Sequence, residues 1–187
     1  MNRHLRRKQK KEGNKKHNIQ SKLIEAIKFH SNKHFDKAES IYKQLNGLSP
    51  NNYDVLRHLG ILNQDLGRLE EAYNFFQEAI KVKPDGFEAL NNLGTIHVLN
   101  KNQNLALKCF ERSNNINPSY VPTINNLAGL YHRLHNGVES LKYSTKALSL
   151  QPNNLLALNQ HAKALVLNDK IDEGIKIFQQ ICNENPE

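Results

Sequence analysis

The sequence has no tryptophan, one methionine and only two cysteines in 187 residues. Cys109 and Cys182 have no Cys or His neighbours at zinc-binding spacings, so they predict neither a disulfide framework nor a zinc site. Aromatic residues make up only 7% of the chain, so its core must consist mainly of Leu, Ile and Ala. The low thiol content is typical of a reducing compartment, and we expect a cytoplasmic location.

Long apolar runs and catalytic motifs are also missing. No stretch approaches the roughly 18 apolar residues of a membrane span, and no apolar stretch follows the charged N-terminus as in a secretory signal. The sequence lacks GxxxxGK[ST], HExxH, GxSxG and any glycine-rich nucleotide turn. The pairs His30/His34 and His132/His135 have helical spacing but no third ligand in register. We therefore expect no enzyme activity, no metal and no other cofactor.

The positive charge is concentrated at the N-terminus. The formal net charge is +8, and residues 1–17 carry eight Lys or Arg against Glu12 alone, which is eight minus one, or +7. High charge with few apolar residues predicts a disordered or extended tail over residues 1–18. Such a tail suits nucleic acid or anionic lipid. It has no aromatic residue to stack on a base, so a solubilising role is the simpler interpretation.

Three columns of residues recur with a period of 34. Prolines fall at Pro50, Pro84, Pro118, Pro152 and Pro186. Small residues fall at Ala38, Ala72, Ala106, Ser140 and Gly174, and mostly bulky residues follow four positions later, at Tyr42, Phe76, Phe110, Ser144 and Phe178. A fixed period of this length is the signature of stacked supersecondary units.

Each unit has the spacing of a helix pair. Apolar residues lie three and four positions apart, which is helical. Turn signals such as Gly67 and Asp169 divide the units, and the repeated proline ends the second helix because it lacks a donor and disfavours helix before it. We predict an all-α fold of five helix–turn–helix units at residues 19–52, 53–86, 87–120, 121–154 and 155–187.

These columns resemble the tetratricopeptide repeat (TPR), whose pattern runs W-x2-L-G-x2-Y, then A-x3-F, then P. Residues 53–86 match it best, with Leu56, Leu59-Gly60, Ala72, Phe76, Ala79 and Pro84. The resemblance covers residues 19–187 and implies a right-handed superhelix, or solenoid. It also implies a non-enzymatic scaffold that binds a protein or peptide partner in a concave groove.

In TPR proteins the first helices of successive units line the groove. The resemblance therefore places twelve candidate peptide-binding residues there: Arg57, His58, Asn91, Asn92, Thr95, Asn125, Asn126, His132, Arg133, Asn159, Gln160 and Lys163. Because amides both donate and accept hydrogen bonds, the row of Asn and Gln suits an extended backbone. It resembles the asparagine ladder of O-linked N-acetylglucosamine transferases. It does not fit the TPR carboxylate clamp, since Pro122 and Asn126 stand where the final Lys and Arg belong.

Two other functions stay open. The units also resemble the N-terminal arms of bacterial TPR glycosyltransferases and sulfotransferases, which would make this chain the substrate-selecting part of a larger enzyme. The second alternative is an adaptor whose basic tail binds RNA or an anionic membrane.

The last unit is apolar without the extra polar helix that usually ends a TPR array. It presents Leu158, Leu165, Ile175, Phe178 and Ile181. Exposed apolar faces promote association. We therefore expect the natural chain to continue past Glu187, or a partner or second copy to cover this end.

Overall fold

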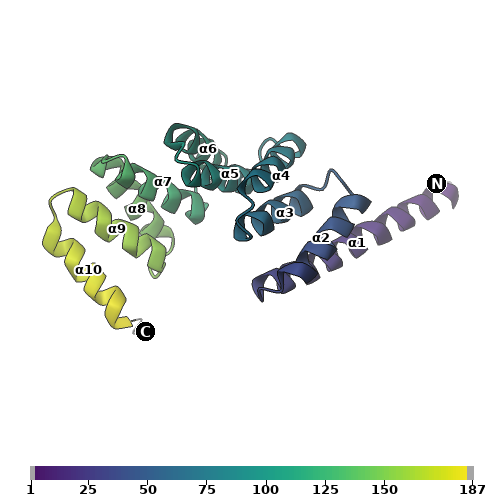
Figure 1. The fold of residues 1–187 in the computed structure, drawn as a ribbon, viewed down its shortest axis with the longest axis horizontal. Coiled ribbons are helices and arrows are strands. Elements are labelled where there is room, and N and C mark those ends of the chain that lie inside the picture. The colour runs from purple at the N-terminus through teal and green to yellow at the C-terminus, as the bar shows by residue number, and fades with distance from the viewer. Residues whose placement is uncertain (1–2, 185–187) are drawn as a thin grey trace. The chain divides into compact units, whose positions relative to one another are not determined.

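The computed structural model describes residues 3–184, and their side chains from residue 17 to residue 183. Within that range the chain forms ten α-helices and no strand (Figure 1). The predicted all-α fold of helix pairs is therefore confirmed. The chain divides into two compact units, Met1–Pro84 and Asp85–Glu187, which we call the N-terminal and C-terminal units. The five repeat boundaries drawn from the proline period remain predictions.

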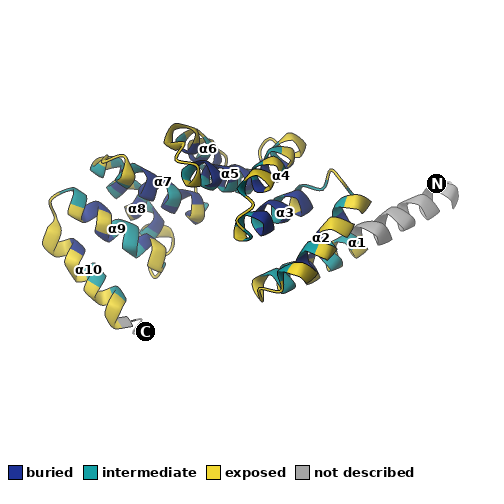
Figure 2. Ribbon diagram, viewed as in Figure 1, coloured by how far each residue is buried: buried dark blue, intermediate teal, exposed yellow. Residues whose placement is uncertain are grey.

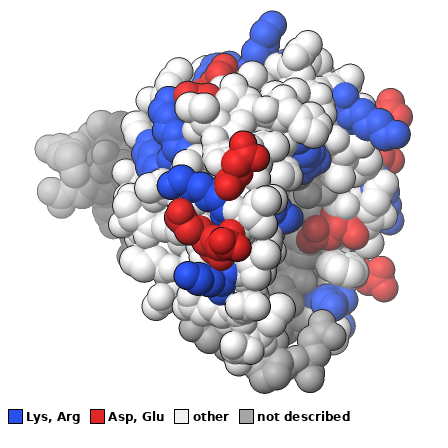
Figure 3. Space-filling model, turned by 90° about the vertical axis from the view of Figure 1, so that its left-hand side faces the viewer, with Lys and Arg blue, Asp and Glu red and all other residues white. Residues whose placement is uncertain are grey.

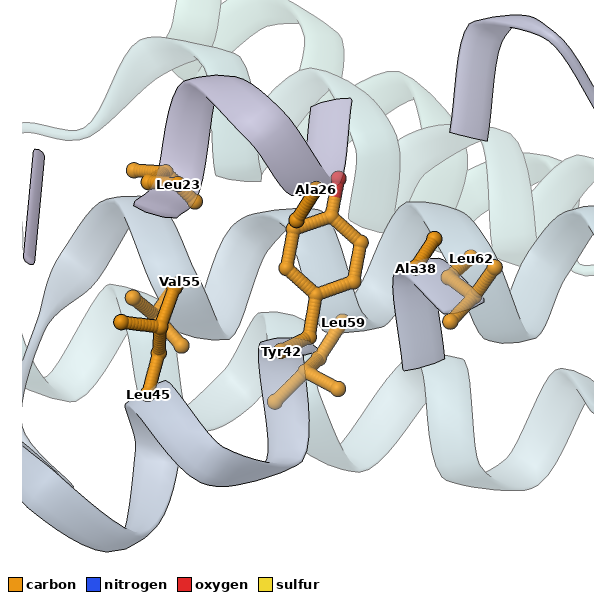
Figure 4. Packing of buried hydrophobic residues seen from close by; sticks show 8 residues of the cluster. All are labelled: Leu23, Ala26, Ala38, Tyr42, Leu45, Val55, Leu59 and Leu62. Carbon is orange, nitrogen blue, oxygen red and sulfur yellow. The ribbon is translucent and has the colours of Figure 1, made fainter. Parts of the chain in front are cut away.

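The N-terminal unit contains four helices, α1 (Arg3–Ser31), α2 (Phe35–Leu48), α3 (Tyr53–Asp65) and α4 (Leu69–Val82). Each packs against the next, and α1 also contacts α3. The core that α1, α2 and α3 share, shown in Figure 4, consists of Leu23, Ala26, Ala38, Tyr42, Leu45, Val55, Leu59 and Leu62. The alanines let α1 and α2 approach closely, and the larger side chains fill the remaining space.

The C-terminal unit contains α5 (Phe87–Leu99), α6 (Gln103–Ile116), α7 (Val121–Arg133), α8 (Gly137–Leu150), α9 (Leu155–Leu167) and α10 (Ile171–Glu184). Helix α7 contacts both α5 and α9, so these three first helices form one layer, which we call the first-helix layer. The second helices pack against them in turn, α6 on α5 and α7, α8 on α7 and α9, and α10 on α9. Figure 2 shows the buried residues concentrated where these helices meet.

Close helix contact explains the columns of small and bulky residues. A Cβ placed on Gly94 would lie 2.6 Å from Cδ1 of Phe110, and a Cβ on Gly60 would lie 2.7 Å from Cδ1 of Phe76. Both aromatic rings are almost fully buried. The glycine on the first helix therefore provides the space that the ring of the second helix occupies.

The turns inside the helix pairs follow the same period. Lys33, Gly67, Lys101, His135 and Asp169 all have positive φ, between 55° and 74°. Only one of these is glycine, so four non-glycine residues adopt the left-handed backbone region, which costs an L-residue about 1–2 kcal/mol. The repeated geometry of the turn therefore overrides the preference of the individual residue.

Helix α1 begins at Arg3, within the stretch for which the sequence predicts a disordered or extended tail. Residues 3–18 contain no proline and many Lys and Arg residues, which are strong helix formers. The tail's proposed contacts with nucleic acid or lipid depend on side chains before residue 17, which lie outside the described part. Among the described residues, no helix has both the length and the apolar character needed to cross a membrane.

The last helix pair has an exposed apolar surface. On α10, Ile171 is 53% exposed and Ile175 is 44% exposed, whereas Leu165 on α9 is buried. Ile175, Phe178 and Cys182 line a shallow pocket on α10. What covers this surface remains a prediction.

Candidate peptide-binding surface

All twelve predicted groove residues lie on the first helices of the pairs. Arg57 and His58 lie on α3 in the N-terminal unit, and the other ten lie on α5, α7 and α9. The structure thus brings ten of them together on the first-helix layer of the C-terminal unit. Of the two residues on α3, His58 lines a separate pocket and Arg57 contacts His58.

Asn91 is buried, and its side-chain amide is engaged by contacts inside the protein. Its Oδ1 accepts hydrogen bonds from the Thr123 hydroxyl at 3.1 Å and from Asn126 Nδ2 at 2.9 Å. The Thr123 hydroxyl lies 2.7 Å from that of Ser113, which also contacts the carbonyl of Phe87 at 2.8 Å. This chain of polar contacts joins α5, α6 and α7. Asn91 therefore acts as a structural link that orients Asn126, rather than as a ligand contact.

Asn92 and Asn125 carry polar atoms that the protein leaves without a hydrogen-bond partner. Asn92 Nδ2 and Asn125 Oδ1 are both buried and unpaired among the described residues, and Asn125 is only 3% exposed. A buried polar atom without a partner costs about 1–3 kcal/mol. These two atoms lie on successive first helices. The C=O and N–H groups of a bound main chain could pair with the donor of Asn92 and the acceptor of Asn125.

Asn125 lines a small pocket of about 80 Å³ in the first-helix layer. Polar residues around the pocket are Thr95, Asn125, Asn126, Arg133 and Gln160. Gly129 also lines it, and a Cβ there would lie 3.0 Å from Gln160 Nε2. Because Gly129 has no side chain, the Gln160 amide has room beside Asn125 and Asn126. Asn159, also on α9, is half-buried.

A group of basic side chains lies at the C-terminal end of α7. Burial lowers the pKa of His132, and the positive charges of Lys163, His135 and Arg133 lower it further. His132 Nδ1 is buried and has no partner among the described residues. Helices α7 and α9 contain no Asp or Glu, and α5 contains only Glu88, in its first turn. The first-helix layer is therefore short of negative charge.

In the N-terminal unit, His58 is held in one protonation state. Its ring stacks on Tyr42, with centroids 5.9 Å apart and planes at 12°. Arg57 Nη2 lies 3.1 Å from His58 Nε2, and because a guanidinium can only donate, this nitrogen accepts. Burial, followed by the charges of Arg57 and His30, lowers the pKa of His58 to about 4. His58 is therefore neutral at pH 7, with its hydrogen on Nδ1.

His58 lines a pocket of about 530 Å³ together with Ile27, His30, Ser31, Lys33, Phe35, Ile61 and Asp65. His30 Nε2 lies 2.8 Å from Asp65 Oδ2, which joins the ends of α1 and α3. Sequence analysis missed Asp65. Its only signal is its position, 35 residues after His30, because no motif marks an acidic residue there. Among the described residues, no group of three His, Cys, Asp or Glu side chains is placed to hold a metal.

The paired helices, their 34-residue period and the layer of first helices define a helical-repeat protein. Two sequence profiles described as tetratricopeptide repeat match residues 29–93 and 87–120. The chain is a tetratricopeptide repeat protein.

Several solved structures have a similar fold. The structure reported in the functional characterization of Pseudomonas aeruginosa pilF matches with a TM-score of 0.77 and 20% identity, over 90% of this chain and 77% of that one. TTC0263, a thermophilic TPR protein in Thermus thermophilus, matches with a TM-score of 0.76 and 16% identity, over 90% and 92%. YrrB, described as a TPR protein with an unusual peptide-binding site, matches with a TM-score of 0.65 and 14% identity, over 89% and 86%. No curated protein gives a significant match. At these identities the similarity establishes the fold alone.

Proposed function

We propose that this protein is a non-enzymatic interaction scaffold that binds an extended segment of a partner protein on the first-helix layer of its C-terminal unit. Membership of the TPR family supports a protein-interaction scaffold in general. The observation that carries the finer proposal is the unpaired buried donor of Asn92 and the unpaired buried acceptor of Asn125. An extended main chain presents N–H and C=O groups alternately, so it can satisfy both.

The contacts also divide the amides into two roles. Asn91 is engaged with Thr123 and Asn126, so it positions its neighbours. Asn92, Asn125 and Gln160 have amide groups available to a ligand, and Asn126 retains its Oδ1 and second hydrogen. The proposed binding residues are therefore a subset of the row that the sequence predicts.

The test starts from an unbiased peptide library displayed on phage and selected on the whole chain. A selected peptide is then titrated against wild-type protein and against a variant carrying both Asn92→Ala and Asn126→Ala. Neutral hydrogen bonds contribute about 0.5–1.5 kcal/mol each, so losing two should weaken binding about 10-fold. Asn74→Ala, an exposed amide on α4, is the matched control. If no peptide is enriched, or if the double variant binds with unchanged affinity, the proposal is wrong.

The two alternative functions stay predictions. A substrate-selecting arm needs a catalytic domain, and the tail adaptor needs side chains before residue 17. No contact within residues 17–183 favours either one.

A further inference from the structure

The pocket beside Asn125 has a size and a lining that suit a small acidic group. A pocket of about 80 Å³ exceeds the roughly 10–15 Å³ that one water molecule needs, so it admits a small polar group of a ligand. Arg133 supplies the only formal charge among its lining residues, Thr95, Val98, Phe110, Asn125, Asn126, Gly129, Arg133 and Gln160. A carboxylate has three heavy atoms and pairs with a guanidinium through two parallel hydrogen bonds.

Four cations of the described part form ion pairs, and Arg133 is not among them. Lys43, Arg68, Lys142 and Lys170 each lie within 4 Å of a glutamate oxygen. Figure 3 shows Lys and Arg interspersed with Asp and Glu on the face that it displays. Among residues 17–183, Arg133 forms no ion pair.

Lys163 is likewise unpaired within residues 17–183. Neither α7 nor α9, the helices that carry Arg133 and Lys163, contributes a carboxylate. The only acidic residue of α5 is Glu88, at the opposite end of its helix from the turn to α6. Arg133 and Lys163 are both exposed, so a carboxylate of a ligand can reach them without competition from an acidic side chain of these helices.

We propose that the first-helix layer selects segments with an internal Asp or Glu, whose carboxylate binds Arg133 while its main-chain N–H donates to Asn125 Oδ1. Lys163 adds a second positive charge beside the site. This inference rests on the proposed function and specifies the chemistry of the partner. The arrangement is not the TPR carboxylate clamp, because Pro122 and Asn126 occupy positions where that clamp needs cations.

The test is a swap of specificity. A random peptide library flanked on both sides by fixed Gly-Ser segments, so that no random residue is terminal, is selected on the wild-type chain and on Arg133→Glu. We expect the wild type to enrich Asp or Glu at one position, and Arg133→Glu to enrich Lys or Arg there with the neighbouring positions unchanged. Lys108→Glu, which makes the same charge change on an exposed residue of α6, should keep the acidic preference. Circular dichroism checks that each variant is folded.

A titration gives the size of the effect. Replacing the selected acidic residue by its amide should weaken binding to wild-type protein about 10- to 100-fold, since charge-assisted hydrogen bonds are the stronger class. The same replacement should change binding to Arg133→Gln much less, and the wild-type affinity should fall as salt is raised.

The outcomes separate the two proposals. Peptides that depend on Asn92 and Asn126 but show no acidic preference, or that keep it in Arg133→Glu, would overturn this inference and leave the proposed function standing. A second library has random residues at a free C-terminus. If peptides are enriched only from that library, the site binds a terminal carboxylate, and the inference of an internal Asp or Glu is wrong. If neither library yields a binder that depends on the amides, the proposed function itself fails.

Discussion

Protonation of His58 should destabilise the N-terminal unit in mild acid. Its pKa is lowered from 6.5 to about 4 in the folded protein, chiefly by burial. Between these values the unfolded chain binds a proton that the folded chain does not, so stability falls as the pH falls from about 6.5 towards 4. Between about pH 7.5 and pH 5 the loss attributable to this one group is up to about 2 kcal/mol. It is largely absent above pH 7.

The assay must report on the N-terminal unit alone, because burial also lowers the pKa of His97, His132 and His161 in the other unit. Hydrogen exchange of the α2 and α3 amides, corrected for intrinsic rates, gives the local free energy of opening. We expect it to fall between pH 7.5 and pH 5 in the wild type, and to change much less in His58→Gln.

The control is His17→Gln, which removes an exposed imidazole from α1 and should keep the wild-type pH dependence. An NMR titration of the His58 ring provides an independent check. The reasoning is refuted if that ring titrates near 6.5, or if His58→Gln is as acid-sensitive as the wild type.

Two further predictions concern the C-terminal unit, and both are read from urea unfolding. Asn91→Ala leaves the Thr123 hydroxyl and an Asn126 hydrogen without their buried acceptor, so it should lower the free energy of unfolding by about 1–3 kcal/mol. Asn159→Ala, at a half-buried amide of α9, is the control and should lower it much less. Equal losses in the two variants would contradict the structural role of Asn91. Gly94→Ala places a methyl group 2.6 Å from the Phe110 ring and should cost about 1–3 kcal/mol by overpacking. Adding Phe110→Leu should recover part of that loss, whereas a further additive loss would show that the ring is not the obstacle.

The sequence was sufficient for the fold. Helix pairs, turns and the TPR family all follow from residues 34 apart, and the left-handed turn residues keep that period although most of them are not glycine. These features are predictable because helix propensity, proline blocks and the three-and-four spacing of apolar residues act over short stretches of chain. The N-terminal tail shows the limit of composition as a guide, since high charge predicted disorder where the helix in fact begins at Arg3.

The roles of individual site residues were decided only by the tertiary structure. Asn91 and Asn92 are adjacent and identical in type, yet one is engaged with residues 32 and 35 positions away and the other keeps a donor unpaired. His30 similarly finds its partner in Asp65, one repeat later. Which side chain a helix turns towards its neighbour depends on the rotation and spacing of packed helices. Those quantities are set by contacts between repeats, which a local pattern of residues does not encode.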